Sequence, residues 1–240
     1  MDSTLQAGVN EPVRPSGQRS TSVSDAVQSR RAVRAFLDDP VPLEVLRRVM
    51  DKARLSPSGC NFQPWEAAIL TGEPLRAIQA EMARTAPQDP IEYEIQPKDL
   101  PAEYLSRLAE IGERQYSSEG IARDDAAARK AFVMRNYSGF GAPVLLLCHF
   151  PRVMGPPQWS DVGMWLQTVM LLLREEGLDS CPQEFLSLYG RLIKQHIGVD
   201  DATQIFFCGL AIGYRDTNAP INQYERTRVD LNRQVTFSGF

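Results

Sequence analysis

The chain has 240 residues, of which 43% are hydrophobic and 23% charged, with a formal net charge of −4 and a pI of about 5.4. This composition is typical of a globular protein with enough chain to bury a large core. The acidic balance argues against a broad basic surface for nucleic acid, and the apolar runs are too short to span a membrane.

The first 23 residues are rich in polar residues, glycine and proline, and they lack the apolar core of a signal peptide. They predict a disordered N-terminal arm over residues 1–23, followed by one domain over residues 24–240. The four cysteines form no CxxC pair, which indicates free thiols in a reducing compartment. The two histidines have no metal-ligand spacing, so no metal site is expected. We therefore expect a soluble, cytoplasmic protein.

Ser24 has the side chain of a helix N-cap, and the helix that it begins would lead into Arg30-Arg31-Ala32-Val33-Arg34-Ala35-Phe36. If this run is helical, Arg30 and Arg34 project from one face, where a single anion could contact both. The planar guanidinium fork suits phosphate. A cluster of charges is also typical of a solvated helix face, so the run alone leaves both interpretations open.

The remaining elements follow from hydrophobic periodicity and turn-forming residues. Apolar residues with helical spacing predict an amphipathic helix over residues 43–53, which stops at a turn around residues 56–59. A surface excursion over residues 85–101 is indicated by four prolines. The other expected elements are strands at 65–70, 144–150 and 205–212 and helices at 75–84, 102–116, 123–135 and 161–176, the last capped by Gly177. Alternating helices and strands indicate a layered α/β or α+β fold.

Three loop segments combine small, amide and charged residues. The first is Ser56-Pro57-Ser58-Gly59-Cys60-Asn61-Phe62-Gln63-Pro64-Trp65, where small residues permit close approach of a ligand to the backbone. The second is Cys181-Pro182-Gln183-Glu184, where N–H groups after the proline could stabilise negative charge. The third is Gln223-Tyr224-Glu225-Arg226-Thr227-Arg228, in a C-terminal arm that could wrap a partner subunit. Taken alone, the first segment is better explained as a structural loop and the arginines of the third as a solvated tail, while the second is also compatible with a turn before the next helix.

Two common nucleotide-binding motifs are absent. Gly139-Phe140-Gly141 precedes a predicted strand and lacks the third glycine of a dinucleotide fingerprint. No Walker A sequence occurs. These observations exclude a conventional Rossmann dehydrogenase and a P-loop enzyme.

In this order, the arginine run, the 56–65 loop, the 161–177 helix, the 181–184 segment and the arginine-bearing tail resemble the FMN-dependent nitroreductase family. The resemblance extends from about residue 24 to the C-terminus, and residues 154–161 look like the branch that reduces nitrobenzoates and related nitroaromatics. It implies an α+β, nitroreductase-like fold with a central mixed β-sheet flanked by helices. It also implies an intertwined homodimer with two FMN molecules at the interface.

The resemblance also assigns residues to roles. Arg30 would bind the FMN phosphate, Arg34 the ribityl chain or the N1/O2 edge, and a backbone N–H near Gln183 and Glu184 would lie close to N5. Pro57, Ser58 and Gly59 would reach the cofactor from the second subunit, and Arg226 and Arg228 would close the phosphate site. The full set expected to bind FMN is Arg30, Arg31, Arg34, Pro57, Ser58, Gly59, Asn61, Pro182, Gln183, Glu184, Arg226 and Arg228. Phe62 and Trp159 would contact a small aromatic substrate, and no side chain is expected to act as a catalytic group or metal ligand.

The implied activity is ping-pong electron transfer from NADH or NADPH, through FMN, to nitroaromatic or quinone-like acceptors. Reductive dehalogenation and flavin modification are alternatives within the same fold. A non-catalytic flavin-binding protein is a third possibility. A helical interaction module would explain the apolar 161–176 helix but not the arginine clusters near both ends of the chain.

Overall fold

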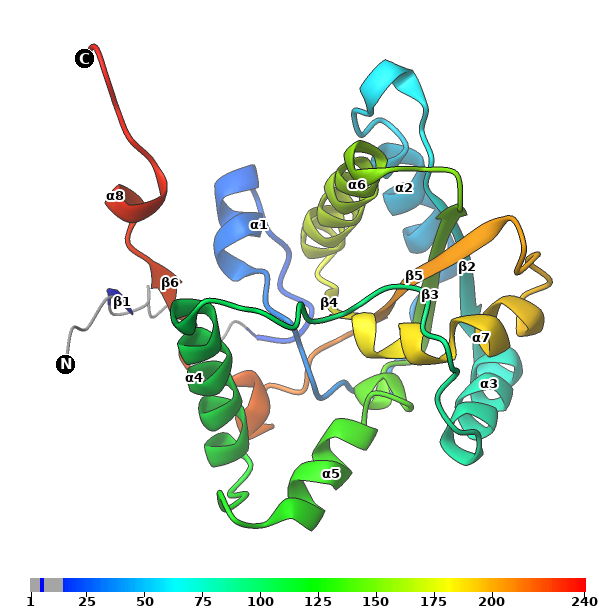
Figure 1. The fold of residues 1–240 in the computed structure, drawn as a ribbon, viewed down its shortest axis with the longest axis horizontal. Helices are drawn as coiled ribbons and strands as arrows, with labels where there is room; N and C mark the ends of the chain where they lie inside the picture. Colours follow the sequence, from blue (N-terminus) through cyan, green and yellow to red (C-terminus); the bar gives the residue numbers. More distant parts are fainter. Residues whose placement is uncertain (1–4, 7–14) are drawn as a thin grey trace.

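The computed structural model describes residues 5–6 and 15–240 of the chain (Figure 1). Its helices are α1 (Val23–Ser29), α2 (Leu43–Ala53), α3 (Gly72–Arg84), α4 (Ala102–Ser118), α5 (Ala126–Met134), α6 (Pro156–Glu175), α7 (Gly190–His196) and α8 (Leu231–Gln234). Its strands are β1 (Leu5–Gln6), β2 (Glu66–Thr71), β3 (Val144–Pro151), β4 (Asp179–Gln183), β5 (Gln204–Gly213) and β6 (Arg228–Val229). Four short 3₁₀ segments complete the description: η1 (Gly59–Asn61), η2 (Gly139–Gly141), η3 (Glu184–Tyr189) and η4 (Pro220–Asn222).

The central sheet has the strand order β2–β3–β5–β4, and each neighbouring pair is antiparallel. The expected mixed sheet is therefore wrong. Strands β3 and β4, which α6 connects, run in the same direction, but β5 lies between them and runs the opposite way. In the described part of the chain, parallel pairing occurs at the isolated bridge between Ala32 and Ser180.

Two helical layers cover the two faces of the sheet (Figure 1). Because side chains alternate along a strand, β3 sends Leu146 and Cys148 toward α2 and α6, and Leu145 and Leu147 toward α3 and α7. These side chains are at most 1% exposed, which explains why β3 reads as an uninterrupted apolar run. The result is a three-layer α/β/α arrangement around two cores.

Several expected elements agree closely with the structure. The amphipathic helix at 43–53 coincides with α2, and the strands expected at 144–150 and 205–212 lie within β3 and β5. Helix α6 begins earlier than expected, at Pro156. Proline is accepted there because the first residues of a helix need no N–H donor. No helix in the described ranges is both long and apolar enough to cross a membrane.

Gly177 ends α6 with a φ of +80°. The N–H of Leu178 donates to the Leu173 carbonyl at 2.8 Å, and the Gly177 N–H donates to the Arg174 carbonyl at 3.1 Å. These bonds form the Schellman motif, which explains the expected cap. Glycine is required here for a second reason, because a Cβ atom would lie 2.3 Å from the Gly17 carbonyl oxygen.

The expected N-terminal arm, residues 1–23, falls partly outside the described residues. Between residues 15 and 23 it makes specific contacts: Ser20 is 6% exposed, and its N–H donates to the Arg174 carbonyl at 2.8 Å. Helix α1 begins at Val23 with Ser22 as its N-cap, so the assignment of Ser24 to that position is wrong. Ser22 is in extended conformation and accepts from the N–H of Asp25, which satisfies a free donor of the first turn.

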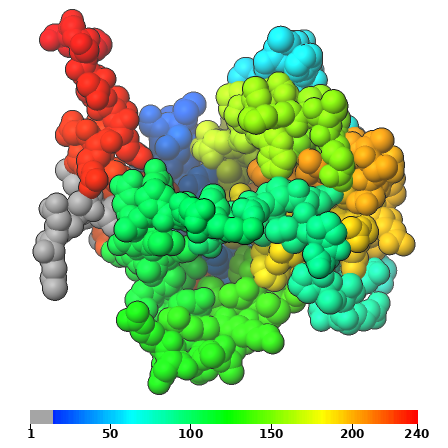
Figure 2. Space-filling view, viewed as in Figure 1, coloured from blue at the N-terminus to red at the C-terminus, as the bar shows by residue number. Residues whose placement is uncertain are grey.

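The excursion at 85–101 crosses one face of the molecule before α4, as Figure 2 shows. A buried ion cluster attaches it to the sheet. The Glu92 carboxylate accepts from Lys194, from Arg152 at 2.7 Å and from the N–H of Phe206 at 3.0 Å. Lys194 is fully buried and also contacts Asp201. This excursion is therefore a fixed part of the fold.

Candidate functional site

The arginine run is extended, not helical. Helix α1 ends at Ser29, and Arg30 has φ −63° and ψ 129°. The run then pairs with β4 and with the segment that follows β5: Val33 donates to the Ser180 carbonyl at 3.1 Å, and Phe36 forms a bridge with Arg215. An extended chain places alternate side chains on the same side. This alternation allows Arg30 and Arg34 to share a side without a helix, and the charges of both act on the Cys181 thiol of β4.

The C-terminal arm packs directly on this run. Arg31 is 8% exposed, and it donates to the Tyr224 carbonyl and lies 5.6 Å from the centre of the Tyr224 ring. Arg34 donates to the Tyr224 hydroxyl at 3.1 Å, and its N–H donates to Asn222 at 2.9 Å. Arg226 donates to the main-chain carbonyls of Arg30 and Gln28. The structure thus brings the two predicted arginine clusters together from opposite ends of the chain.

Arg30 and Arg228 form a pair of like charges. Among the described residues, the Arg30 guanidinium has neither a hydrogen bond nor an ion pair, although it is half-buried. Burial lowers the pKa of Arg30, and the positive charge of Arg228 lowers it further. The Arg228 side chain donates to a neutral group, the Thr227 carbonyl, at 2.7 Å. Two neighbouring guanidinium groups that have no carboxylate partner in the part of the chain that the structure describes favour an anion.

The Cys181–Glu184 segment lies beside these arginines. Burial raises the pKa of Cys181, and the charges of Arg34 and Arg30 oppose that shift, which places both cations close to β4. The expected turn at Pro182 is wrong, because Pro182 lies within β4, at the edge of the sheet. An edge strand tolerates proline because one side of the strand needs no N–H donor.

Gln183 presents an unpaired acceptor at this site. It is 2% exposed, and its side-chain amide donates to Asn136 at 3.0 and 3.1 Å. Its Oε1 atom is buried and has no hydrogen-bond partner among the described residues. A buried acceptor without a donor is costly, and a ligand donor would satisfy it. Next to it, burial raises the pKa of the Glu184 carboxyl.

The loop at residues 57–63 has a strained backbone. Cys60, Asn61 and Gln63 have φ values of 52°, 57° and 50°, in the left-handed region that non-glycine residues rarely adopt. The Ser58 hydroxyl accepts from the Gln63 N–H at 2.9 Å, and the buried Asp161 carboxylate accepts from the Gly59 N–H at 3.2 Å. Such strain persists where the surroundings enforce it, and it is concentrated at functional sites.

Within one chain, this loop does not reach the arginine run. The loop is attached to α6 at Asp161, near the start of the helix, whereas Ser29 contacts α6 at Arg174, near its end. The two points are 13 residues apart, which corresponds to about 20 Å along a helix. Figure 1 shows the loop, in cyan, at the opposite end of α6 from the last turn of α1. Pro57 and Asn61 are exposed, and Phe62 is 55% exposed.

Trp159 belongs to an aromatic cluster at the start of α6. Its ring meets those of Phe150, Tyr93 and Phe207 edge-on, at 4.8, 5.2 and 5.5 Å between ring centres. Tyr93 comes from the excursion, and its hydroxyl donates to the Phe207 carbonyl. This packing favours a role in the core for Trp159, with one face of the cluster formed by the excursion.

Tyr93, Asn136 and Asn222 were not predicted from the sequence. Asn222 accepts from Arg34 and donates to the carbonyls of Ala35 and Asp216 at 2.8 Å, which fixes the arginine run to the C-terminal segment. Its position two residues after Pro220, in a polar tail, was the one available signal. Within the described ranges, no group of three or more histidine, cysteine or acidic side chains is arranged to hold a metal.

Comparisons with known proteins agree with the fold. The model of the Nitroreductase family matches residues 27–214, and the chain belongs to this family. A curated relative, 4-nitrobenzoate reductase of Pseudomonas putida, is 38% identical over 217 residues, which cover 89% of this chain and 94% of that protein.

Two solved structures extend the comparison. The FMN- and NADPH-dependent nitroreductase NfnB of Sphigopyxis sp. strain HMH is 48% identical, with a TM-score of 0.87 and coverage of 92% of this chain and 100% of that chain. The FMN-dependent NfnB of Mycobacterium smegmatis, in complex with NADPH, is 29% identical with a TM-score of 0.82. It covers 90% of this chain and 97% of that chain.

Proposed function

We propose that this protein is an FMN-containing oxidoreductase that passes electrons from NADPH to nitroaromatic or quinone-like acceptors. The observation that carries the proposal is the pair of like charges at Arg30 and Arg228, together with the Oε1 atom of Gln183, which is buried and unpaired among the described residues. A phosphate would neutralise the two guanidinium charges, and a hydrogen-bond donor on a planar ring would satisfy the Oε1 atom of Gln183. Membership of the Nitroreductase family and the relatives that act on nitroaromatics support the same assignment.

The residues present fit FMN. Arg30 and Arg228 would hold its phosphate, while Arg34 would contact the ribityl chain or the N1/O2 edge. The Arg226 guanidinium already bonds to the carbonyls of Gln28 and Arg30, so it would serve the site by holding the arginine run. Arg31 would hold Tyr224 and the C-terminal arm in the same way. Once bound, the cofactor supplies the redox chemistry, and the protein supplies orientation and electrostatics.

The N5 side of the ring would face the end of β4. Pro182, Gln183 and Glu184 would lie against it, with Gln183 held by its two bonds to Asn136. A guanidinium at the N1/O2 edge stabilises negative charge that develops there. No side-chain nucleophile is needed for this chemistry.

The second half of the site would come from a second copy of the chain. The loop that holds Pro57, Ser58, Gly59 and Asn61 contacts α6 about 20 Å along the helix from the contact made by Ser29, which precedes the arginine run. A homodimer would bring the loop of one chain to the arginines of the other. Phe62, exposed on the same loop, would then face the substrate. Trp159 would support the substrate space through its aromatic cluster.

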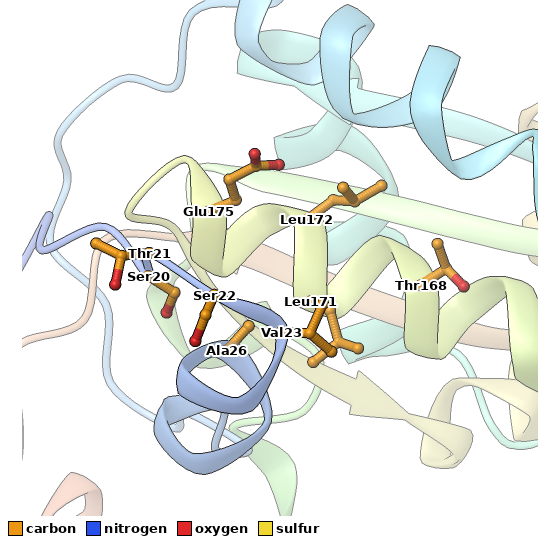
Figure 3. Close-up of a pocket in the computed structure, with 9 residues that line it drawn as sticks. All are labelled: Ser20, Thr21, Ser22, Val23, Ala26, Thr168, Leu171, Leu172 and Glu175. Carbon is orange, nitrogen blue, oxygen red and sulfur yellow. The ribbon is translucent and has the colours of Figure 1, made fainter.

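An apolar cavity between α1 and α6 supports this association (Figure 3). Its volume is about 390 Å³, and Val23 and Ala26 from α1 face Leu171, Leu172 and Thr168 from α6. Val23 is 75% exposed, and Val27 and Met164 on the same helices are also exposed. Exposed apolar surface of this kind is typical of an interface.

The free cysteines agree with a cytoplasmic protein.

Anaerobic reduction tests the proposal. The purified protein should show flavin absorbance, which NADPH should bleach and a nitroaromatic should then restore. Protein that stays colourless after reconstitution with FMN would contradict it. Flavin that NADPH cannot reduce would indicate a non-catalytic flavin-binding protein, and turnover of halophenols in preference to nitroaromatics would indicate reductive dehalogenation.

A further inference from the structure

A buried carboxylate lies beneath the start of the arginine run. Asp179, the first residue of β4, is 1% exposed. Its two oxygens accept from Arg215, from Nε at 2.7 Å and from Nη2, in the parallel arrangement that is strongest for this pair. Arg174 approaches the same carboxylate at 3.2 Å. Arg215 follows β5, and Arg174 lies in the last turn of α6, so one side chain joins three elements.

The guanidinium groups that Asp179 holds are bonded to Ser29. Nη2 of Arg215 donates to the Ser29 carbonyl at 3.3 Å, and Nε of Arg174 donates to the Ser29 hydroxyl at 3.3 Å. Ser29 is the last residue of α1, and Arg30 follows it directly. The position of Asp179 therefore fixes the peptide group that precedes Arg30.

The peptide group after Arg30 is fixed as well. The carbonyl of Arg30 accepts from Arg226, so the main-chain carbonyls on both sides of this residue are held by guanidinium groups. The side chain of Arg30 has no partner among the described residues that could orient it. Its direction thus depends on the backbone, and the backbone depends on Arg215 and Asp179.

Arg215 also fixes the far end of the run. It forms an antiparallel bridge with Phe36, while its side chain reaches back to Ser29. A single residue therefore contacts the extended segment at both ends. A fork-to-carboxylate bond to Asp179 is needed to hold a side chain in that geometry, because an unpaired guanidinium at this depth would be costly.

We propose that Asp179 is a positioning residue of the anion site, which directs Arg30 toward the ligand phosphate through Arg215 and Ser29. This inference rests on the proposed function, since the phosphate is that of FMN. The loss of positioning and the loss of a negative charge change the affinity for phosphate in opposite directions. Removal of a negative charge would by itself strengthen the binding of a phosphate, whereas loss of positioning weakens it.

Riboflavin provides the test, because it has the ring and ribityl chain of FMN but no phosphate. The dissociation constants of both flavins are measured by fluorescence titration of the full-length apoprotein. Wild type is expected to prefer FMN. In Asp179→Asn the preference should fall by about tenfold, the scale of one misplaced charge-assisted hydrogen bond, with riboflavin affinity nearly unchanged. Asp179→Glu, which keeps the charge, should restore part of the preference.

Glu92→Gln is the matched control. It removes another buried carboxylate that binds two cations, and it lies in the excursion, away from the arginine run. Glu92→Gln should lower the free energy of unfolding and leave the preference for FMN over riboflavin unchanged. If Asp179→Asn does not fold, Arg215→Lys carries the test, because a lysine keeps the charge but cannot bridge both carboxylate oxygens and Ser29.

Equal weakening of both flavins, or an unchanged or increased preference for FMN, would overturn the positioning role. A wild-type protein that binds neither flavin would instead contradict the proposed function. A wild-type protein that binds both equally would remove the phosphate from the arginine site, and the positioning role with it.

Discussion

Arg30 is the residue on which the proposed anion site most depends. Its guanidinium is half-buried beside Arg228 and has no carboxylate partner among the described residues. Replacement by alanine should weaken FMN binding by about 1–3 kcal/mol, the cost of losing a hydrogen bond to a charged group. This corresponds to roughly a 5- to 150-fold higher dissociation constant, measured by flavin fluorescence.

Arg54→Ala is a suitable control for Arg30→Ala. Arg54 is exposed and pairs with Asp51 on the surface, so FMN affinity should not change in this variant. Unchanged affinity in Arg30→Ala itself would remove Arg30 from the phosphate site.

A substitution at Gly177 tests how much a single residue contributes to stability. A Cβ atom there would lie 2.3 Å from the Gly17 carbonyl oxygen, on a residue whose φ of +80° already disfavours a side chain. Gly177→Ala should therefore lower the free energy of unfolding by about 2–4 kcal/mol, measured by urea denaturation.

Gly198 separates the two contributions to that loss. Its φ is +70°, but a Cβ atom there would meet nothing within 4 Å. Gly198→Ala should cost only the backbone strain, about 1 kcal/mol. Equal losses in both variants would show that contact with Gly17 contributes nothing.

At the scale of elements, the end of α6 is tied to α2 by Glu176. Its carboxylate accepts from Arg48 at 3.1 and 3.2 Å and from Arg19 at 3.1 Å. The hydrogen bond from Arg48 lowers the pKa of Glu176 below its ordinary 4.5. A carboxylate with a depressed pKa contributes stability above its unfolded pKa, and this contribution is lost as the pH falls through the folded pKa.

Glu176→Gln should therefore be less stable than wild type at pH 7, by about 1 kcal/mol, the upper end for pairs that are partly exposed. The difference should close as the pH falls from 4.5 through the lowered pKa of Glu176, where wild type also loses the charge. Glu73→Gln, which removes an exposed pair with Arg76, should match wild type at both pH values. A pH-independent difference would contradict an electrostatic origin.

How far the sequence could predict these elements depends on what determines them. Helix α2 follows from its own apolar period, so residues 43–53 were predicted without error. The conformation of the arginine run is decided by Ser180 and Arg215, which are remote in sequence, and local spacing suggested a helix instead. Strand β4 was missed because Pro182 is typical of a turn, and only its edge position makes a strand possible.

In the candidate site, too, some features follow from the local sequence and others depend on residues that are remote in sequence. The chemistry of Arg30 and Arg228 is visible in the sequence, since two arginine clusters suggest an anion. Their juxtaposition comes from the packing of the C-terminal arm, through Tyr224 and Asn222. Asp179 carried no sequence signal, because an isolated acid after a helix resembles an ordinary solvated residue.

At the scale of the whole molecule, the proposed site is divided between the two ends of α6, and only a second chain would complete it. Val23 lines the cavity between α1 and α6 and is 75% exposed within one chain. A glutamate at this position would add little strain to a single chain but would place a charge in an apolar interface, which is costly without a partner. Val23→Glu should therefore shift the protein from the proposed dimer to a monomer.

Because the 57–63 loop would reach the cofactor from the other subunit, Val23→Glu should also weaken FMN binding as the dimer dissociates. Analytical ultracentrifugation at several protein concentrations, with flavin and protein absorbance recorded together, measures both effects. Val153→Glu is the matched control, since Val153 is 87% exposed in the turn after β3 and should leave mass and flavin content unchanged. A Val23→Glu protein that is monomeric yet retains wild-type FMN affinity would place the whole cofactor site within one chain.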